Sequence, residues 1–415
     1  MNRLMSYGIL TIALAGVVAG CQPSSTDENL AAGVTVHSEN GGQPNLAVSP
    51  SGELLLSWVE YVNDSTDALL MSRLDNDGWT QPGEIARGRN WFVNWADFPS
   101  VVAFGDGKTL AAHWLQKSAE GTYDYDVRIA ISTDNGNSWS ESFIPHTDGV
   151  AAEHGFVSMI PVDSNRILAI WLDGRHMASN GGHDHGHGGG PMTLRSAEFD
   201  AGGNLYAEAE LDNMVCECCQ TDAAMTSAGP VVVYRDRDSS EVRDISIVRR
   251  VDEQWTSPQR LHRDHWEIAG CPVNGPAVDA RDSIVAVAWF TAPEGVAQVN
   301  VLFSEDGGAS FGQAVRADDG KPVGRVDIVL TEAGDALVSW IENTGEEGSI
   351  RVRRVNARGP VGESVHLHAT STSRRSGFPV LISNGDDLHM AFTAISGDRT
   401  GVSSKSVRLK QFAAQ

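Results

Sequence analysis

The sequence has little positive charge and no second long apolar run. Lysine and arginine number 31 against 54 aspartates and glutamates, which gives a formal net charge of −23. A surface of this sign repels nucleic acid and anionic lipid, so we expect neither as a partner. After residue 20 no apolar stretch is long enough to form a membrane-spanning helix. We therefore expect a soluble body folded around its own core.

The N-terminus has the features of a targeting segment. The single basic residue Arg3 is followed by an apolar run at positions 9–18 and then by small residues before Cys21, as in an export signal. The sequence Val-Ala-Gly-Cys at 18–21 resembles the cleavage box of bacterial lipoproteins. The resemblance implies a signal peptide at 1–20, a lipid on Cys21, a tether at 21–31 and an extracytoplasmic, membrane-anchored protein, either periplasmic or on the cell surface. An ordinary secretory signal is the alternative.

The sequence after the N-terminal segment contains internal repeats. Short apolar runs that end in an aromatic residue recur every 51 to 63 residues. These aromatics are Trp58, Trp114, Trp171, Tyr234, Trp289, Trp340 and Phe392. Each run follows a turn and another apolar strand, and alternating segments come after it. Four short strands per repeat predict an all-β propeller, and we predict one seven-bladed domain over 32–415, with six blades as the alternative.

The last repeat has room for only three strands. A lone strand candidate at 33–36 precedes the first repeat. We expect it to supply the fourth strand of the last blade, because closing the ring in this way removes exposed strand edges.

Two turns carry a family signature of the form Ser-x-Asp-x-Gly-x-x-aromatic. Their defining residues are Ser132, Asp134, Gly136 and Trp139 in one, and Ser304, Asp306, Gly308 and Phe311 in the other. Both turns resemble the Asp box, or BNR repeat, of the sialidase superfamily. The resemblance implies turns between third and fourth strands, on the face opposite an active site. The arginine-containing catalytic motif of sialidases is not matched.

Four cysteines, Cys216, Cys218, Cys219 and Cys271, lie in the least scaffold-like part of the chain. Two disulfides are one interpretation, although the adjacent Cys218 and Cys219 would bridge each other only with strain. The other is a soft-metal site, because several thiolates in one small volume favour copper(I) or zinc.

A glycine-rich stretch places three histidines on alternating positions, His183, His185 and His187. Such tracts bind zinc, copper or nickel, though ordering a flexible tether costs entropy. A tolerated polar insertion is the alternative.

Propeller geometry predicts that loops entering the innermost strands and loops between second and third strands open on one face. Candidate ligand-binding residues in these loops are Arg175, Arg235, Arg243, Asn274, Arg325, Arg374 and Arg375. Surface ion pairs are the plainer interpretation of the alternating charges at 235–244.

We therefore predict that the face formed by Cys216 to Asn274 and adjacent loops binds a soft metal or a small-molecule or glycan ligand. The alternative is an exo-glycosidase acting on anionic glycans, with Asp97, Tyr234 and Glu241 as candidate catalytic residues.

Overall fold

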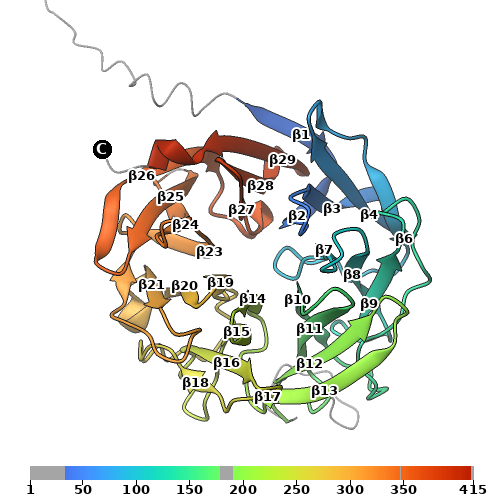
Figure 1. The fold of residues 1–415 in the computed structure, drawn as a ribbon, viewed down its shortest axis with the longest axis horizontal. Helices are drawn as coiled ribbons and strands as arrows, with labels where there is room; N and C mark the ends of the chain where they lie inside the picture. The colour runs from blue at the N-terminus through green and yellow to red at the C-terminus, as the bar shows by residue number, and fades with distance from the viewer. Residues whose placement is uncertain (1–32, 178–189, 346, 413–415) are drawn as a thin grey trace, which may run out of the picture.

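The structure is a computed structural model that describes residues 33–177, 190–345 and 347–412. Seven antiparallel sheets stand around a central axis as the blades of a propeller (Figure 1). Helical structure in the described residues is confined to three 3-10 turns, η1 (Pro293–Gly295), η2 (Arg374–Ser376) and η3 (Leu409–Phe412). None of the described helices has the length and apolar character needed to cross a membrane.

Each blade runs outward from a strand beside the central axis. Blade 1 contains β2 (Gly41–Val48), β3 (Leu54–Asn63), β4 (Thr66–Asp75), β5 (Gly78–Trp79) and β6 (Gly83–Gly88). Blade 2 contains β7 (Ser100–Ala103), β8 (Leu110–Lys117) and β9 (Tyr125–Ser132). Blade 3 contains β10 (His154–Pro161), β11 (Arg166–Asp173), β12 (Thr193–Asp200) and β13 (Leu205–Asp212). Blade 4 contains β14 (Asp222–Thr226), β15 (Gly229–Arg235), β16 (Ile245–Val251), β17 (Gln254–Trp255) and β18 (Gln259–Arg260).

The remaining blades complete the ring. Blade 5 contains β19 (Ala277–Arg281), β20 (Ile284–Thr291), β21 (Gln298–Ser304) and β22 (Val315–Arg316). Blade 6 contains β23 (Pro322–Leu330), β24 (Ala336–Asn343), β25 (Gly348–Asn356) and β26 (Gly359–Thr370). Blade 7 contains β27 (Val380–Asn384), β28 (Asp387–Ser396), β29 (Arg399–Arg408) and β1 (Val34–Ser38).

The ring closes as the sequence predicts. Strand β1 pairs antiparallel with β29, with Val34 opposite Lys405 and Val36 opposite Ser403. The N-terminal strand therefore forms the outer edge of the last blade (Figure 1). The prediction of seven blades is confirmed. Blade 2 has three strands instead of four. In place of a fourth strand it has an isolated bridge between Ile129 and Phe143.

The recurring aromatics lie on the second strand of each blade and are buried there. In three blades the tryptophan donates its indole N–H to an acid two residues later. Trp58 bonds Glu60 at 3.0 Å, Trp171 bonds Asp173 at 2.8 Å and Trp340 bonds Glu342 at 2.6 Å. These pairs satisfy the buried indole nitrogens and fix an acidic group at the end of each strand.

The two turns that resemble Asp boxes have the local geometry expected from the sequence. Asp134 accepts from the Ser138 backbone N–H at 2.9 Å, and Gly136 has a φ of 78°. Asp306 accepts from the backbone of Ser310 at 2.8 Å in the same way. Both turns follow third strands, β9 and β21. They therefore lie at the opposite end of the propeller from the loops that enter the central strands.

Candidate functional site

One end of the propeller collects the loops that enter the central strands and the loops between second and third strands; we call it the loop face. Several of its non-glycine residues adopt left-handed backbone conformations, among them Phe156 with φ 54°, Glu241 with φ 60°, Val273 with φ 49° and Arg325 with φ 58°. Such conformations are strained for bulky side chains and concentrate at functional positions.

The four thiols meet on this face. The Cys216 sulfur lies 3.3 Å from that of Cys219 and 3.9 Å from that of Cys218. Interactions first with Cys216 and then with Cys219 and Cys271 raise the pKa of Cys218, so the fourth thiol also reaches the group. All four are free cysteines. The structure thus brings the predicted metal-binding cysteines together and does not contain the disulfides of the alternative interpretation.

The surroundings of Cys216 favour the ionised form of its thiol. It is fully buried, and Arg243 Nη1 lies 3.2 Å from its sulfur. Burial opposes ionisation, but hydrogen bonds with Cys218 and Cys219 and the charge of Arg243 outweigh it. The pKa of the Cys216 thiol is therefore well below its usual range, and a thiolate is the form a metal binds.

The alternating charges of 235–244 form a network against this thiol. Arg243 contacts Glu217 Oε2 at 2.8 Å and Glu241 Oε2 at 2.9 Å. Arg237 bonds the same two acids, reaching Glu241 Oε1 at 2.5 Å. The charges at 235–244 therefore form ion pairs, as one interpretation of the sequence predicted. These pairs join the loop of Cys216 to the loop after β15. Arg243 and Glu241 position the thiols and are not open to a ligand's charge.

Arg235 and Asn274 are scaffold residues in this structure. The Arg235 side chain is 1% exposed and donates to the backbone carbonyls of Asn274, Arg243 and Phe290. Asn274 Oδ1 in turn accepts from the Arg325 backbone N–H at 2.7 Å. The prediction that Arg235 and Asn274 bind a ligand is therefore wrong, because their polar groups are used in these bonds. The bonds hold blades 4, 5 and 6 together on the loop face.

Two acids, Asp97 buried and Glu153 partly buried, share one tyrosine beside the thiols. The Tyr125 hydroxyl lies 3.1 Å from Asp97 Oδ2 and 2.9 Å from Glu153 Oε1. One hydroxyl proton serves only one acceptor, so the second contact is favourable when a carboxyl keeps its own proton. Burial raises the pKa of Asp97 to about 7, and burial with the charges of Asp97, Cys271 and Glu217 raises that of Glu153 to about 8.

The three predicted catalytic residues do not form a common site. Asp97 contacts Tyr125 and the Phe156 backbone, and the cavity that it lines measures about 10 Å³. Tyr234 is buried and bonds Asp212 at 2.6 Å, while Glu241 is engaged by arginines. Asp97, Tyr234 and Glu241 thus each bond to different neighbours, and no shared pocket joins them. Sequence reasoning missed Tyr125 and Glu153, because no motif marks them.

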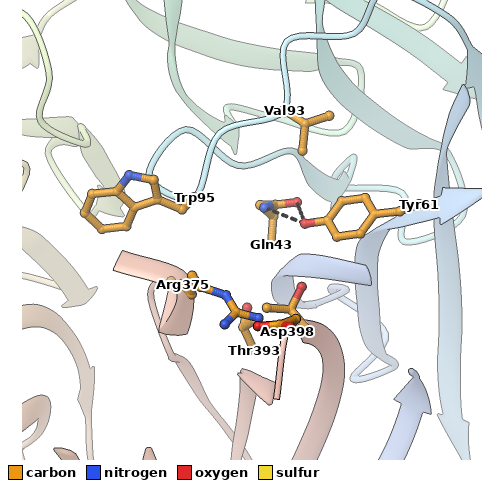
Figure 2. Close-up of a pocket in the computed structure, with 9 residues that line it drawn as sticks. Gln43, Tyr61, Val93, Trp95, Arg375, Thr393 and Asp398 are labelled. Carbon is orange, nitrogen blue, oxygen red and sulfur yellow. Dashed lines mark hydrogen bonds between the residues drawn. The ribbon is translucent and has the colours of Figure 1, made fainter. Parts of the chain in front are cut away.

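A pocket of about 380 Å³ opens between blades 7 and 1 on the loop face (Figure 2). Trp95 and Arg375 line it, with Asp398 beside Arg375 and Tyr61 held by Gln43 across the opening. This space is wider than the cavity that Asp97 lines, and it offers an aromatic face and hydrogen-bonding groups together.

Arginines gather behind this pocket. Arg325 and Arg374 lie over the Trp95 ring at 5.0 and 5.8 Å from its centre. Arg325 is 4% exposed, and its side chain bonds only Ser376 and backbone carbonyls. Burial and then the charge of Arg374 lower the pKa of Arg325 to about 10. Among the described residues no salt bridge involves Arg325, Arg374 or Arg375. Arg374 and Arg375 are exposed and can meet an anion, whereas Arg325 is buried behind them.

Other predicted residues lie elsewhere. Arg175 bonds Asp173 between blades 2 and 3. Cys21, His183, His185 and His187 fall outside the described residues.

No protein-family model and no curated protein matches the sequence. Solved structures do match. A polysaccharide lyase named Uly1 is 8% identical over 89% of this chain and 90% of its own, with a TM-score of 0.54. A Dyadobacter fermentans protein of unknown function is 14% identical over 91% and 98%, with a TM-score of 0.51. A PL25 ulvan lyase bound to -[GlcA(1-4)Rha3S]- is 11% identical over 78% and 81%, with a TM-score of 0.50.

These likenesses show the propeller fold and nothing finer. Sialidases are among the more remote matches. The chain is thus similar in fold to polysaccharide lyases.

Proposed function

We propose that this protein binds a soft metal ion, copper(I) or zinc, through Cys216, Cys218, Cys219 and Cys271 on the loop face. The observation that carries the proposal is the convergence of four unbridged thiols, three of them with sulfurs within 4.8 Å of one another. Thiolates prefer soft and borderline ions over Mg²⁺ or Ca²⁺.

The surroundings support the same conclusion. Arg243 stabilises a thiolate at Cys216, and its bonds to Glu217 and Glu241 fix its direction. Such partners around a metal-binding residue orient it and tune its affinity. Cys271 is exposed, whereas Cys216 and Cys219 are buried. An ion could therefore enter from the side of Cys271 and be held by the buried pair.

Metal analysis of protein reduced under anaerobic conditions tests the proposal. We expect one copper(I) or zinc ion per chain after loading, and a loss of about 100-fold or more in affinity for Cys218→Ser and Cys271→Ser. His262→Ala, at a half-exposed histidine outside the cluster, serves as the control and keeps the affinity. Two disulfides in the freshly purified protein, or an affinity that the serine variants leave unchanged, would refute the proposal.

A second candidate function is recognition of an anionic glycan in the Trp95 pocket. The arginines without acidic partners favour it, since a guanidinium binds a carboxylate or sulfate strongly and an aromatic ring packs on a sugar face. One structure of similar fold holds a glucuronate-containing, sulfated disaccharide unit. Hydrolysis by an exo-glycosidase is the enzymatic form of this candidate.

Two measurements separate these forms. Calorimetric titration with uronate-containing and sialylated oligosaccharides reports binding, and product analysis reports turnover. We expect binding that Arg374→Ala and Arg375→Ala weaken. Equal affinity for anionic and neutral oligosaccharides would remove the candidate, and binding without product would remove the enzymatic form.

We also propose that the protein is lipid-anchored outside the cytoplasm through Cys21. Radiolabelled palmitate should enter the wild-type protein and not Cys21→Ser. Equal labelling of both would contradict the anchor.

A further inference from the structure

The pocket between blades 7 and 1 is lined mainly by groups that form hydrogen bonds. Its polar lining residues are Gln43, Tyr61, Arg375, Thr393, Asp398 and Thr400, together with the indole of Trp95. Its volume of about 380 Å³ lies near the lower end of the range for small-molecule sites, about 300–1,000 Å³. A lining with so many donors and acceptors suits a ligand covered with hydroxyl groups, such as a sugar ring.

The walls of this pocket surround its opening. In Figure 2, Trp95 and Tyr61 lie on opposite sides of the opening, with Val93 above them and Arg375 and Asp398 below. A polysaccharide that continues in both directions needs a groove that is open at two ends. A surrounding wall therefore fits one end of a glycan chain and not its interior.

The backbone of these walls is held in close approach. A Cβ atom at Gly42 would lie 2.6 Å from the Tyr61 hydroxyl, and one at Gly377 would lie 3.2 Å from Thr393 Oγ1. Gly377 has a φ of 58°, and Gln43 has a φ of 51°. Such a conformation is strained for a residue with a side chain, and it persists where the surrounding structure enforces it. The pocket is therefore formed before any ligand enters.

One hydroxyl in the pocket lacks a partner. Thr393 is 4% exposed and lines the pocket, and its side-chain hydroxyl has no hydrogen-bond partner among residues 33–177, 190–345 and 347–412. Buried polar groups almost always have a partner, because an unmade hydrogen bond in the interior is costly. A polar ligand group that enters the pocket supplies the missing bond.

An acid and a base lie at one edge of the pocket without pairing. Arg375 donates to the carbonyl oxygen of Gly397 at 3.0 Å, and Asp398 is the next residue. Arg374, Arg375 and Asp398 are exposed, and none of the three forms an ion pair in the described part of the chain. The edge is thus positive overall but includes one carboxylate. It favours a negatively charged ligand that also offers hydrogen-bond donors.

We propose that this pocket binds a single terminal uronate ring, with the ligand carboxylate on Arg375 and two neighbouring ligand hydroxyls on Asp398. The inference rests on the anionic-glycan candidate for the Trp95 pocket, and it adds the end of the glycan that enters and the contacts that give specificity. A guanidinium binds a carboxylate through two parallel N–H donors, and a carboxylate accepts one hydroxyl on each oxygen. An amino sugar also offers donors to Asp398, but its positive charge is repelled by Arg374 and Arg375.

The variant Asp398→Asn distinguishes hydroxyl recognition from simple repulsion. Calorimetric titration with methyl β-glucuronide measures the affinity of the variant and of the wild type. If Asp398 accepts ligand hydroxyls, the variant binds about tenfold more weakly or worse, because hydrogen bonds to a charged group are lost. If Asp398 only repels the ligand carboxylate, the variant binds up to about fivefold more tightly. Affinity equal to or higher than that of the wild type overturns the proposal.

Asp386→Asn is the matched control. It removes the same charge from an exposed turn between β27 and β28, at the opposite end of blade 7, and we expect it to keep the wild-type affinity. Thr393→Val, which keeps the shape of the side chain and removes its hydroxyl, is expected to weaken binding severalfold. Methyl β-glucosaminide should bind more weakly than the glucuronide, and the reverse order overturns the assignment of a uronate.

A pair of oligosaccharides tests which part of the glycan enters the pocket. One carries glucuronate at its non-reducing end, and in the other a further sugar caps that glucuronate. We expect only the uncapped compound to bind with the affinity of the methyl glucuronide, and equal affinity for both overturns terminal recognition. Binding of sialylated oligosaccharides without binding of the glucuronide overturns this inference alone. Absence of binding by every anionic oligosaccharide removes the glycan candidate as well.

Discussion

The acid pair around Tyr125 predicts an unusual dependence of stability on pH. Asp97 is 2% exposed, and burial raises its pKa from an ordinary value of 3.8 to about 7, despite hydrogen bonds from Phe156 and Tyr125 that favour the charged form. A carboxyl with a raised folded-state pKa binds more protons in the folded than in the unfolded protein. Its stabilising effect is therefore complete below pH 3.8 and is lost as pH rises to about 7.

Asp97→Asn isolates this effect. Asparagine has nearly the same shape as the protonated acid, keeps an oxygen for the Phe156 N–H and does not ionise. Each pH unit between 5 and 7 costs the wild-type protein about 1.4 kcal/mol. From pH 5 to pH 9 the wild type should therefore lose about 3 kcal/mol of unfolding free energy that the variant does not lose. Glu153 adds to the trend in both proteins, since its pKa is raised too.

Urea unfolding of both proteins at pH 5, 7 and 9 measures the difference. We expect the variant to gain on the wild type with rising pH, with most of the change complete near pH 7. Asp64→Asn, at an exposed turn between β3 and β4, is the matched control and should show no such gain. If the unfolding free energies of Asp97→Asn and wild type differ by the same amount at all three pH values, the buried carboxyl of Asp97 does not hold a proton in the folded protein, and the reasoning is refuted.

Three further outcomes test other parts of the structure. Arg243→Gln removes the guanidinium 3.2 Å from the Cys216 sulfur, so the pKa of that thiol rises. Titration of the thiolate absorbance against pH measures the rise, and an unchanged titration curve would contradict the assignment. Trp95→Ala should weaken binding of anionic oligosaccharides about tenfold in calorimetry, with Trp95→Phe closer to wild type; equal loss in both would exclude a stacking role. Serine hydrogen bonds lower the pKa of Asp134 and Asp306 to about 2, so their stabilisation is present above pH 4 and is lost toward pH 2. The double asparagine variant should therefore melt lower than wild type at pH 7 but not at pH 2, and a difference that persists at pH 2 would contradict it.

The repeat could be predicted because it depends only on the order of residues within each short segment. An apolar run with a terminal aromatic describes one strand packed between neighbouring blades, and its recurrence sets the number of blades. The closing role of the strand at 34–38 followed from counting strands in the last repeat, where only three were available. Neither inference needed knowledge of which side chains meet across the ring.

The functional side chains were harder to place because their roles depend on contacts between distant loops. Arg235 and Arg325 looked equivalent in sequence, as arginines next to turns. In the structure Arg235 is held by three backbone carbonyls from two loops and a neighbouring strand, whereas Arg325 lies behind a pocket.

The loop face is divided by charge, and the division bears on what it can bind. Toward blades 2 to 4 it presents the thiols of the proposed metal site and the Tyr125 acid pair. Glu153 and His154 are adjacent, and Glu153 responds to Asp97, Cys271 and Glu217, while His154 faces Asp148. Toward blades 6, 7 and 1 it presents Arg325, Arg374 and Arg375 around Trp95, which gain from an anion. The proposed metal ion and the proposed anionic ligand would therefore occupy separate sides of one face, in a protein whose net charge is −23.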